Sequence, residues 1–366
     1  MHNSGKVSRG GLEDVVAVCT RLSRVDGHAG ELVIAGHRVE ELADNHGFEE
    51  VCHLLWHGEL PTPAALTEFR ARLGRKRARV HEMLVQQGTP AMTDPMDALR
   101  SVLARFESND DLVDDATTMV AAVPTANAWW WSHGSGAPAP APREDLSTAA
   151  DYLRMITGRD PGPAAARALE RYLVTVCDHG MNASTFTARI IASTRSDLIS
   201  AVVGAVGALK GPLHGGAPGP VLEMLDAIGS AGQAELWLRR ELAARRRIMG
   251  MGHRIYRVRD PRAAVFERAV GELSGTGERN ERLDLARSVE RTAEALLAAA
   301  HPGRNLKANV EFYTAVLLEA VGVPRELFTA TFAVGRMAGW AAHVMEQRAE
   351  DRLIRPQSEY VGPVPA

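Results

Sequence analysis

The chain has 366 residues, of which 45% are hydrophobic and 24% charged, and its formal net charge is −3. This composition is typical of a globular protein, and the charge favours neither nucleic acid nor an anionic membrane as a partner. No apolar run reaches the roughly 18 residues of a membrane span, and the N-terminal residues lack the apolar core of a signal peptide. The cysteines Cys19, Cys52 and Cys177 form no CxxC pattern, so we expect free thiols in a reducing cytoplasm.

Strand-like alternation of polar and apolar residues is confined to the beginning of the chain, around residues 30–39. Helical patterns follow almost everywhere else. Polar capping residues open a helix at 145–158, and apolar residues at helical spacing line one face of 163–180. Asp260 and Pro261 are typical of an N-cap and a first helical residue. Further helices are predicted at 281–300, 309–324 and 327–351. The sequence therefore predicts an all-α protein.

The stretch SHGSGAPAPAPRED, residues 132–145, alternates alanine and proline in its middle. Such a composition favours extended backbone, as in linkers. The chain is long enough for two domains. The stretch could divide them, or it could equally form a surface loop within one domain.

Two patterns suggest sites that we do not predict. Cys52, His53 and His57 could suggest a metal, but there is no HExxH motif and a zinc site needs three or four ligands. We therefore expect no metal and interpret this stretch as a packed helix end. The basic run 70–84 lacks interleaved aromatic residues, so we interpret it as a solvated face rather than a nucleic-acid site.

Four titratable residues stand beside glycines or helix-capping residues. His214 lies in GPLHGGAP, His179 in CDHGMNAS, His253 in MGMGHRIY and Glu311 in KANVEFY. Histidines and a carboxylate on separate loops can provide acid–base chemistry. Fixed positive charge suited to binding carboxylates comes from Arg262, Arg336 and Arg355. Spacing alone does not bring these groups together, because that requires a fold.

Six ordered segments along almost the whole chain resemble the citrate synthase family. They are residues 30–62, 178–217, 249–262, 309–324, 332–347 and 352–362. The resemblance implies an all-α, two-domain fold. It implies a large domain of residues 1–215 completed by 323–366, and a small domain of 216–322 that carries the CoA loop and Glu311. His214 would lie at the hinge.

The resemblance also implies a role for each residue. His214 matches the histidine that stabilises the enol of acetyl-CoA, His253 the histidine that polarises the ketone of oxaloacetate, and Glu311 the catalytic base. Arg355 matches an arginine that enters the neighbouring subunit's site, which implies a homodimer. The family's oxaloacetate-binding residues correspond to His179, Arg262 and Arg336. Its CoA-binding residues correspond to Arg257, which would contact the CoA phosphates, and to Gly250, Gly252 and Asn309.

Two residues depart from the family pattern. Pro218 replaces the asparagine of GGAN, which we interpret as a tolerated loop change. Glu311 stands where the family usually has aspartate, and its side chain is one methylene longer. Because a misplacement of about 1 Å can cost roughly a hundredfold in rate, either the helix start is set back or the enzyme is slow or prefers another substrate.

The implied reaction is condensation of acetyl-CoA with oxaloacetate, followed by thioester hydrolysis to citrate and CoA, with no permanently bound cofactor. One alternative is a 2-methylcitrate synthase that uses propionyl-CoA, since one methylene is worth only about 1–3 kcal/mol of discrimination. Another is a weakly active or inactive paralogue that acts as a binding or regulatory dimer. Glu311 is the feature that supports this last alternative.

Overall fold

The computed structural model describes residues 11–12, 15–88, 92–136, 140–215, 218–253, 255–273 and 280–365. Helices make up most of these ranges, so the predicted all-α fold class is confirmed. The strands among them form one antiparallel sheet of β1 (Ser23–Asp26), β2 (Glu31–Ile34) and β3 (His37–Arg38), in that order. The strand-like stretch at 30–39 is thereby confirmed, whereas β1 was not predicted.

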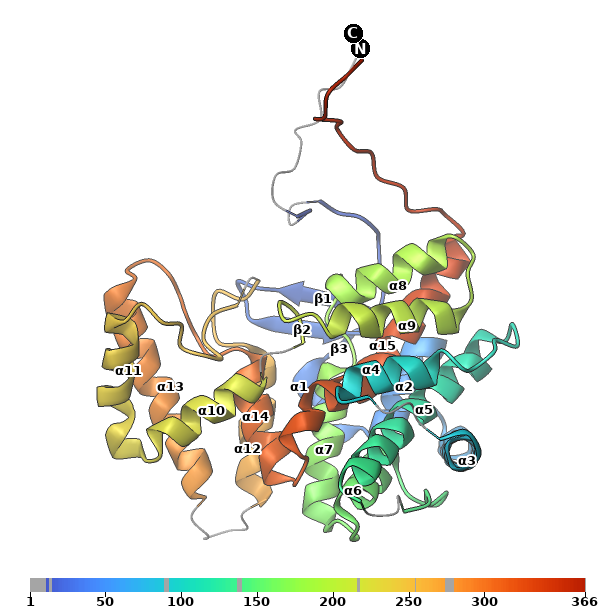
Figure 1. Cartoon of the computed structure of the whole chain (residues 1–366), viewed down its shortest axis with the longest axis horizontal. Coiled ribbons are helices and arrows are strands. Elements are labelled where there is room, and N and C mark those ends of the chain that lie inside the picture. Colours follow the sequence, from blue (N-terminus) through green and yellow to red (C-terminus); the bar gives the residue numbers. More distant parts are fainter. Residues whose placement is uncertain are drawn as a thin grey trace.

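A long C-terminal helix, α15 (Phe328–Glu350), packs against helices from much earlier in the chain (Figure 1). Its Gly339 allows this approach, because a Cβ there would collide with the carbonyl oxygen of Cys177. The partners of α15 include α2, α4, α5, α7, α8 and α9. The helices of this part are α1 (Val39–Asn45), α2 (Phe48–His57), α3 (Pro63–Gln87), α4 (Pro95–Leu103), α5 (Leu112–Gly134), α6 (Thr148–Thr157), α7 (Pro163–Val176), α8 (Ala183–Ser193) and α9 (Leu198–Leu209).

A second group of helices, yellow to orange in Figure 1, gathers to one side of these. Within it α12 packs on α14, and both also contact α7. The group comprises α10 (Pro218–Ile228), α11 (Ala234–Ala243), α12 (Pro261–Leu273), α13 (Glu281–Ala300) and α14 (Val310–Ala320), with short 3₁₀ turns at Ala231–Gln233 and Arg325–Leu327. All five helices fall inside the range expected for the small domain, but the boundaries themselves remain a prediction.

The alanine-proline stretch at 132–145 connects α5 to α6, and these two helices pack on each other. It is therefore a surface loop rather than a linker between domains, although residues 137–139 lie outside the described ranges. The predicted helix at 163–180 ends earlier, at Val176. This early end leaves Asp178 and His179 on a loop, where their side chains can enter a site.

The described segments before β1 and after α15 lie outside the helical body. The segment after α15, residues 352–365, is extended and leaves the body on the same side of Figure 1 as the N-terminal segment. Near its beginning, the Ile354 amide donates to Ser193 Oγ at 3.1 Å. Among the described residues, no helix combines the length and the apolar character needed to cross a membrane.

Candidate active site

His253 lies in the loop between α11 and α12, and the backbone fixes its tautomer. The amides of Ile255 and Tyr256 both donate to His253 Nδ1, at 3.0 and 3.1 Å. Burial, with the nearby charge of Arg262, lowers the pKa of His253 to about 4. The ring is therefore neutral near pH 7 and carries its proton on Nε2, which makes that atom a hydrogen-bond donor.

His179 lies close to His253, on the loop between α7 and α8. The two rings are 5.8 Å apart between centroids, and His179 Nε2 lies 3.2 Å from Tyr256 Oη. Burial lowers the pKa of His179 well below its usual value, and the charges of Arg262 and Arg336 lower it further. This histidine is also neutral, and it contributes a polar edge to the site without adding charge.

Two buried guanidinium groups face the same region, Arg262 from the first turn of α12 and Arg336 from α15. Arg262 forms a two-point ion pair with Asp260, with Nε and Nη2 at 3.0 and 2.8 Å from the carboxylate oxygens. Arg336 Nε donates to the carbonyl oxygen of Val176 at 2.7 Å. Within the described ranges Arg336 has no salt bridge. Burial lowers its pKa to about 10, and the charge of Arg262 acts in the same direction. The positive charges of Arg262 and Arg336 repel each other, and an anion bound between them would relieve this repulsion.

Glu311 lies in the first turn of α14, with its amide held by the N-cap side chain of Asn309 at 3.0 Å. Its Oε2 is buried and has no hydrogen-bond partner in the described part of the chain. Burial raises the pKa of Glu311 to about 7, partly opposed by the charge of Arg262. A carboxylate that takes up and releases a proton near neutral pH is suited to general base catalysis.

Asn309 joins the His253 loop to α14. Its Nδ2 donates to the carbonyl oxygen of Gly252 at 2.9 Å, and its amide donates to that of Gly250 at 2.9 Å. Gly250 has a φ of 74°, and a Cβ there would lie 2.9 Å from the side chain of Phe312. The glycines and Asn309 thus set the distance between His253 and Glu311, whereas their contact with CoA remains a prediction.

His214 follows α9 and is held by two helices. Its Nε2 lies 2.8 Å from Ser184 Oγ on α8, and Trp340 Nε1 on α15 donates to the same hydroxyl at 3.1 Å. Burial lowers the pKa of His214 to about 4, and the charge of Arg336 lowers it further. Residues 216 and 217 and the side chain of Pro218 lie outside the described part, so the proline departure has no structural account.

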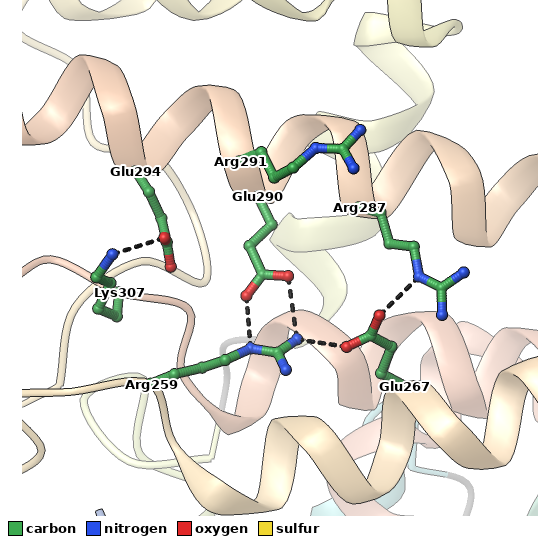
Figure 2. Close-up of a pocket in the computed structure, with 7 residues that line it drawn as sticks. All are labelled: Arg259, Glu267, Arg287, Glu290, Arg291, Glu294 and Lys307. Atoms are coloured by element: carbon green, nitrogen blue, oxygen red, sulfur yellow. Dashed lines mark hydrogen bonds and ion pairs between the residues drawn. The ribbon is translucent and has the colours of Figure 1, made fainter.

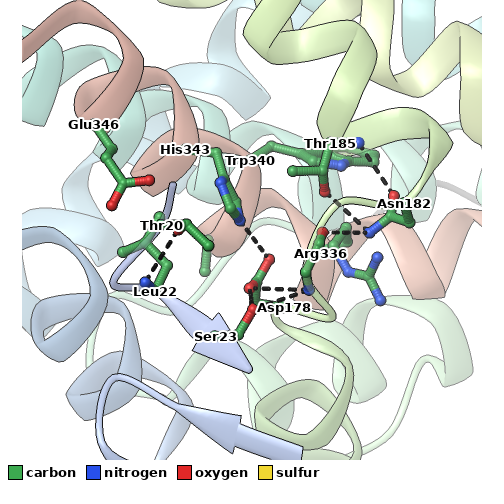
Figure 3. Close-up of polar contacts among 12 residues, drawn as sticks. Thr20, Leu22, Ser23, Asp178, Asn182, Thr185, Arg336, Trp340, His343 and Glu346 are labelled. Atoms are coloured by element: carbon green, nitrogen blue, oxygen red, sulfur yellow. Dashed lines mark hydrogen bonds and ion pairs between the residues drawn. The ribbon is translucent and has the colours of Figure 1, made fainter. Parts of the chain in front are cut away.

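Asp178, beside His179, belongs to a buried network that the sequence patterns did not indicate (Figure 3). Arg189 Nη1 donates to His343 Nδ1 at 3.0 Å, so His343 Nε2 carries a proton and donates to Asp178 Oδ1 at 3.1 Å. Ser23 Oγ on β1 donates to the other carboxylate oxygen of Asp178. The network fixes the backbone of the His179 loop to β1, α8 and α15.

An open cavity of about 640 Å³ lies away from these residues, between α12 and α13 (Figure 2). Arg259 crosses it, pairing with Glu290 at 2.7 Å and Glu267 at 2.7 Å. Tyr313 on α14 donates to Glu290 at 2.6 Å. The charged groups of this cavity are largely paired, and it contains neither the site histidines nor Glu311. We therefore interpret its ion pairs as contacts that hold the loop of His253 and Arg262 in place.

Two of the residues expected at the site lie apart from this cluster within one chain. Arg355 is exposed in the extended C-terminal segment (Figure 1). Arg257 is exposed on the His253 loop, where its amide donates to the carbonyl oxygen of Gly27 at 2.8 Å. The sequence had not indicated Tyr256, Ser184 or Trp340, and it had indicated Asp260 only as a helix N-cap, although all four lie in the segments quoted for the resemblance.

Comparison with known proteins identifies the family. The profile of the domain described as "Citrate synthase, C-terminal domain" matches residues 11–357. The chain belongs to the citrate synthase family. As a member, it is an acyltransferase. Its relatives include a citrate synthase of Acidithiobacillus ferridurans, 37% identical over 96% of this chain and 95% of that protein. A 2-methylcitrate synthase of Mycobacterium tuberculosis H37Rv is also 37% identical, over 96% of this chain and 90% of that protein.

Solved citrate synthase structures share the fold over nearly the whole chain. That of Thermotoga maritima superposes with a TM-score of 0.84 at 37% identity and covers 97% of this chain and 96% of its own. A ternary complex of carboxymethyl coenzyme A and oxaloacetate with the citrate synthase of Thermoplasma acidophilum gives a TM-score of 0.85 at 29% identity, with the same coverage. The citrate synthase fold, with its two helical domains, is thereby shown for this chain.

Proposed function

We propose that this citrate synthase family member condenses acetyl-CoA with oxaloacetate and hydrolyses the resulting thioester to citrate and CoA. The observation that carries the proposal is the carboxylate of Glu311. It is buried, has no partner for Oε2 in the described structure, and has a pKa raised to about 7 by burial. The charge of Arg262 acts on this carboxylate and also on His179 and His253. Proton abstraction next to a carbonyl needs a base together with groups that stabilise the negative charge that develops.

Oxaloacetate, a dianion, fits the two buried arginines. Arg262 and Arg336 would each bind a carboxylate, and His179 would add a polar contact between them. His253 Nε2–H, fixed as a donor by the backbone contacts at Nδ1, would donate to the ketone oxygen. This contact draws electrons from the ketone carbon, which becomes the electrophile, and it stabilises the alkoxide that forms there.

Acetyl-CoA would place its methyl group between Glu311 and His214. Glu311 takes a methyl proton while His214 donates to the thioester oxygen, where the enolate charge develops. In the ligand-free chain Ser184 Oγ donates its single proton to Asn182 Oδ1 at 2.7 Å. If that proton turns to His214 Nε2 when acetyl-CoA binds, the proton of the neutral ring lies on Nδ1, which is then the donor. The enol carbon bonds to the ketone carbon, whose oxygen takes a proton from His253, and water then releases CoA from the thioester. Arg257, Gly250, Gly252 and Asn309 would border the CoA site.

Use of propionyl-CoA is the second candidate, because a relative of equal identity is a 2-methylcitrate synthase. The extra methyl group of propionyl-CoA changes the binding energy by only about 1–3 kcal/mol. An inactive binding dimer is disfavoured, because the histidines, the arginines and Glu311 occur together in one polar site.

A thiol-release assay with oxaloacetate and a series of acyl-CoAs tests the proposal. We expect the highest kcat/KM with acetyl-CoA and citrate as the product. A higher kcat/KM with propionyl-CoA would assign the 2-methylcitrate reaction instead. An absence of thiol release with every acyl-CoA, by folded protein that binds oxaloacetate, would contradict the proposal. Variant Arg336→Lys serves as the control for oxaloacetate binding, since lysine keeps the charge but loses the planar two-point contact.

A further inference from the structure

Tyr172 on α7 carries a buried hydroxyl that the proposed mechanism does not use. The side chain has no exposed surface, and its ring stacks on Phe266 of α12 with centroids 5.2 Å apart. Its Oη has no hydrogen-bond partner in the described ranges. A buried hydroxyl without a partner is unfavourable by comparison with phenylalanine at the same place. We therefore expect the hydroxyl of Tyr172 to find its hydrogen-bond partner in another state of the protein, one that the ligand-free chain does not adopt.

The surroundings of the hydroxyl include the reacting carboxylate. The α7 helix packs against α12, α14 and α15, which carry Arg262, Glu311 and Arg336. Burial raises the pKa of the Tyr172 phenol, the charge of Glu311 raises it further, and that of Arg336 opposes the rise. Glu311 Oε2 is thus a second buried atom without a partner in the same environment. The charged and titratable groups that act on this pair are Arg262, Asp260, Arg336 and Tyr152.

We propose that Tyr172 is a positioning residue for the base: when oxaloacetate is bound, its hydroxyl donates to Glu311 Oε2 and holds the carboxylate. This role rests on the proposed function of Glu311. The longer stem of glutamate extends the reach of the carboxylate from the start of α14 by one methylene, and α14 packs against α7. On this proposal, an aspartate at position 311 would be too short to accept from the Tyr172 hydroxyl.

Variant Tyr172→Phe tests the proposal through the pH dependence of kcat/KM for acetyl-CoA at saturating oxaloacetate. A hydrogen bond to the ionised carboxylate lowers its pKa, so its loss should move the acid limb of the profile upward by about 1 pH unit. The KM for oxaloacetate should stay unchanged. The ligand-free variant should melt no lower than the wild type, since the hydroxyl that it loses has no partner there. An unchanged acid limb would overturn the proposal, as would an effect confined to the KM for oxaloacetate.

Tyr152→Phe is the matched control. Tyr152 is equally buried, but its hydroxyl lies 2.9 Å from Thr331 Oγ1. This control should lower the melting temperature and leave the acid limb unchanged. A shift of the acid limb in both variants would show a general effect of core changes and would overturn the assignment.

The double variant Glu311→Asp with Tyr172→Phe separates this proposal from the proposed function. In the Glu311→Asp background the shorter carboxylate no longer reaches the hydroxyl, so Tyr172→Phe should leave the acid limb where it is. A full shift in that background would overturn the proposal. If the wild type releases no thiol at all, the proposed function fails. If the wild type is active but all tyrosine variants have its profile, only the positioning role fails.

Discussion

Burial determines the protonation state of each side chain to which we assign a role in the reaction. It lowers the pKa of His214 and of His253 to about 4 and raises that of Glu311 to about 7. The neutral histidines can donate to a carbonyl oxygen without first losing a proton, and the carboxylate can accept one near neutral pH. Both kinds of shift follow from desolvation, which disfavours the charged form of every group.

These pKa values predict the pH profile of kcat/KM for acetyl-CoA. The rate should rise with pH through a single limb, where Glu311 becomes ionised. That limb should lie near pH 7 without the proposed contact from Tyr172 and about 1 unit lower with it. The histidines stay neutral down to about pH 4, so they should add no second limb between pH 5 and 9. Steady-state kinetics across that range check this, and a bell-shaped profile with a falling limb below pH 9 would contradict it.

Glu311 should also reduce the stability of the ligand-free fold at alkaline pH. Its pKa rises from 4.5 to about 7 on folding, so the stability contributed by the protonated form is complete below pH 4.5 and is lost as the pH rises through 7. Variant Glu311→Gln stays neutral. It should therefore be more stable than the wild type by about 1–3 kcal/mol at pH 8 and by almost nothing at pH 4.5.

Urea unfolding at both pH values measures this difference. The histidines are common to both proteins, so their own titration cancels in the comparison. A stability gain of the same size at pH 4.5 and pH 8 would show that ionisation of Glu311 is not its cause.

At the scale of secondary structure, the site depends on loops that are tied to helix starts. Asn309 caps α14 and also holds the glycine loop before His253, so one residue links Glu311, the proposed base, to His253. Arg259 fixes the end of the same loop to α13 through Glu290. Each tie replaces the regular backbone pairing that a loop lacks.

Gly250→Ala should break this linkage. The residue has a φ of 74°, and the added methyl group would lie 2.9 Å from Phe312. We expect a loss of about 1–3 kcal/mol in unfolding free energy, together with a larger fall in kcat as His253 moves. Gly134→Ala is the control, because Gly134 ends α5 and a Cβ there meets nothing within 4 Å. Equal stability and activity in the two variants would argue against the role of the loop.

Sequence patterns predicted most helices, because periodic apolar residues and caps are local signals. They placed the start of α12 at Asp260, whose side chain does accept from the Arg262 amide at 3.0 Å. They missed β1, whose residues Ser23–Asp26 show no alternation of their own and depend on pairing with β2.

The sequence indicated the residues to which we assign the reaction but gave no account of their surroundings. His343 meets Asp178 across 165 positions of the chain, and Trp340 meets Ser184 across 156. Such contacts are set by the packing of α15 and leave no spacing pattern in the sequence. The tautomer of His253 and the unpartnered oxygen of Glu311 likewise became apparent only in the folded chain.

At the scale of the whole molecule, we propose a homodimer in which Arg355 completes the partner's site. Within one chain Arg355 is exposed in the segment after α15, whereas His179, Arg262 and Arg336 are buried. A twofold dimer would let each subunit donate and receive the same residue.

Subunit mixing tests this arrangement. Arg355→Ala and His214→Ala should each be inactive alone. A heterodimer of the two contains one site with both residues intact, so mixing should restore activity. Heterodimers that are shown to form but remain inactive would contradict the shared site.

The central claim is that Glu311 removes a methyl proton from acetyl-CoA at this site. The most direct measurement is deuterium exchange into the acetyl-CoA methyl group in D₂O, with a non-reacting analogue of oxaloacetate bound. The wild type should exchange, Glu311→Gln should not, and Glu311→Asp should exchange about a hundredfold more slowly if its carboxylate falls about 1 Å short. Exchange by Glu311→Gln at the rate of the wild type would contradict the account.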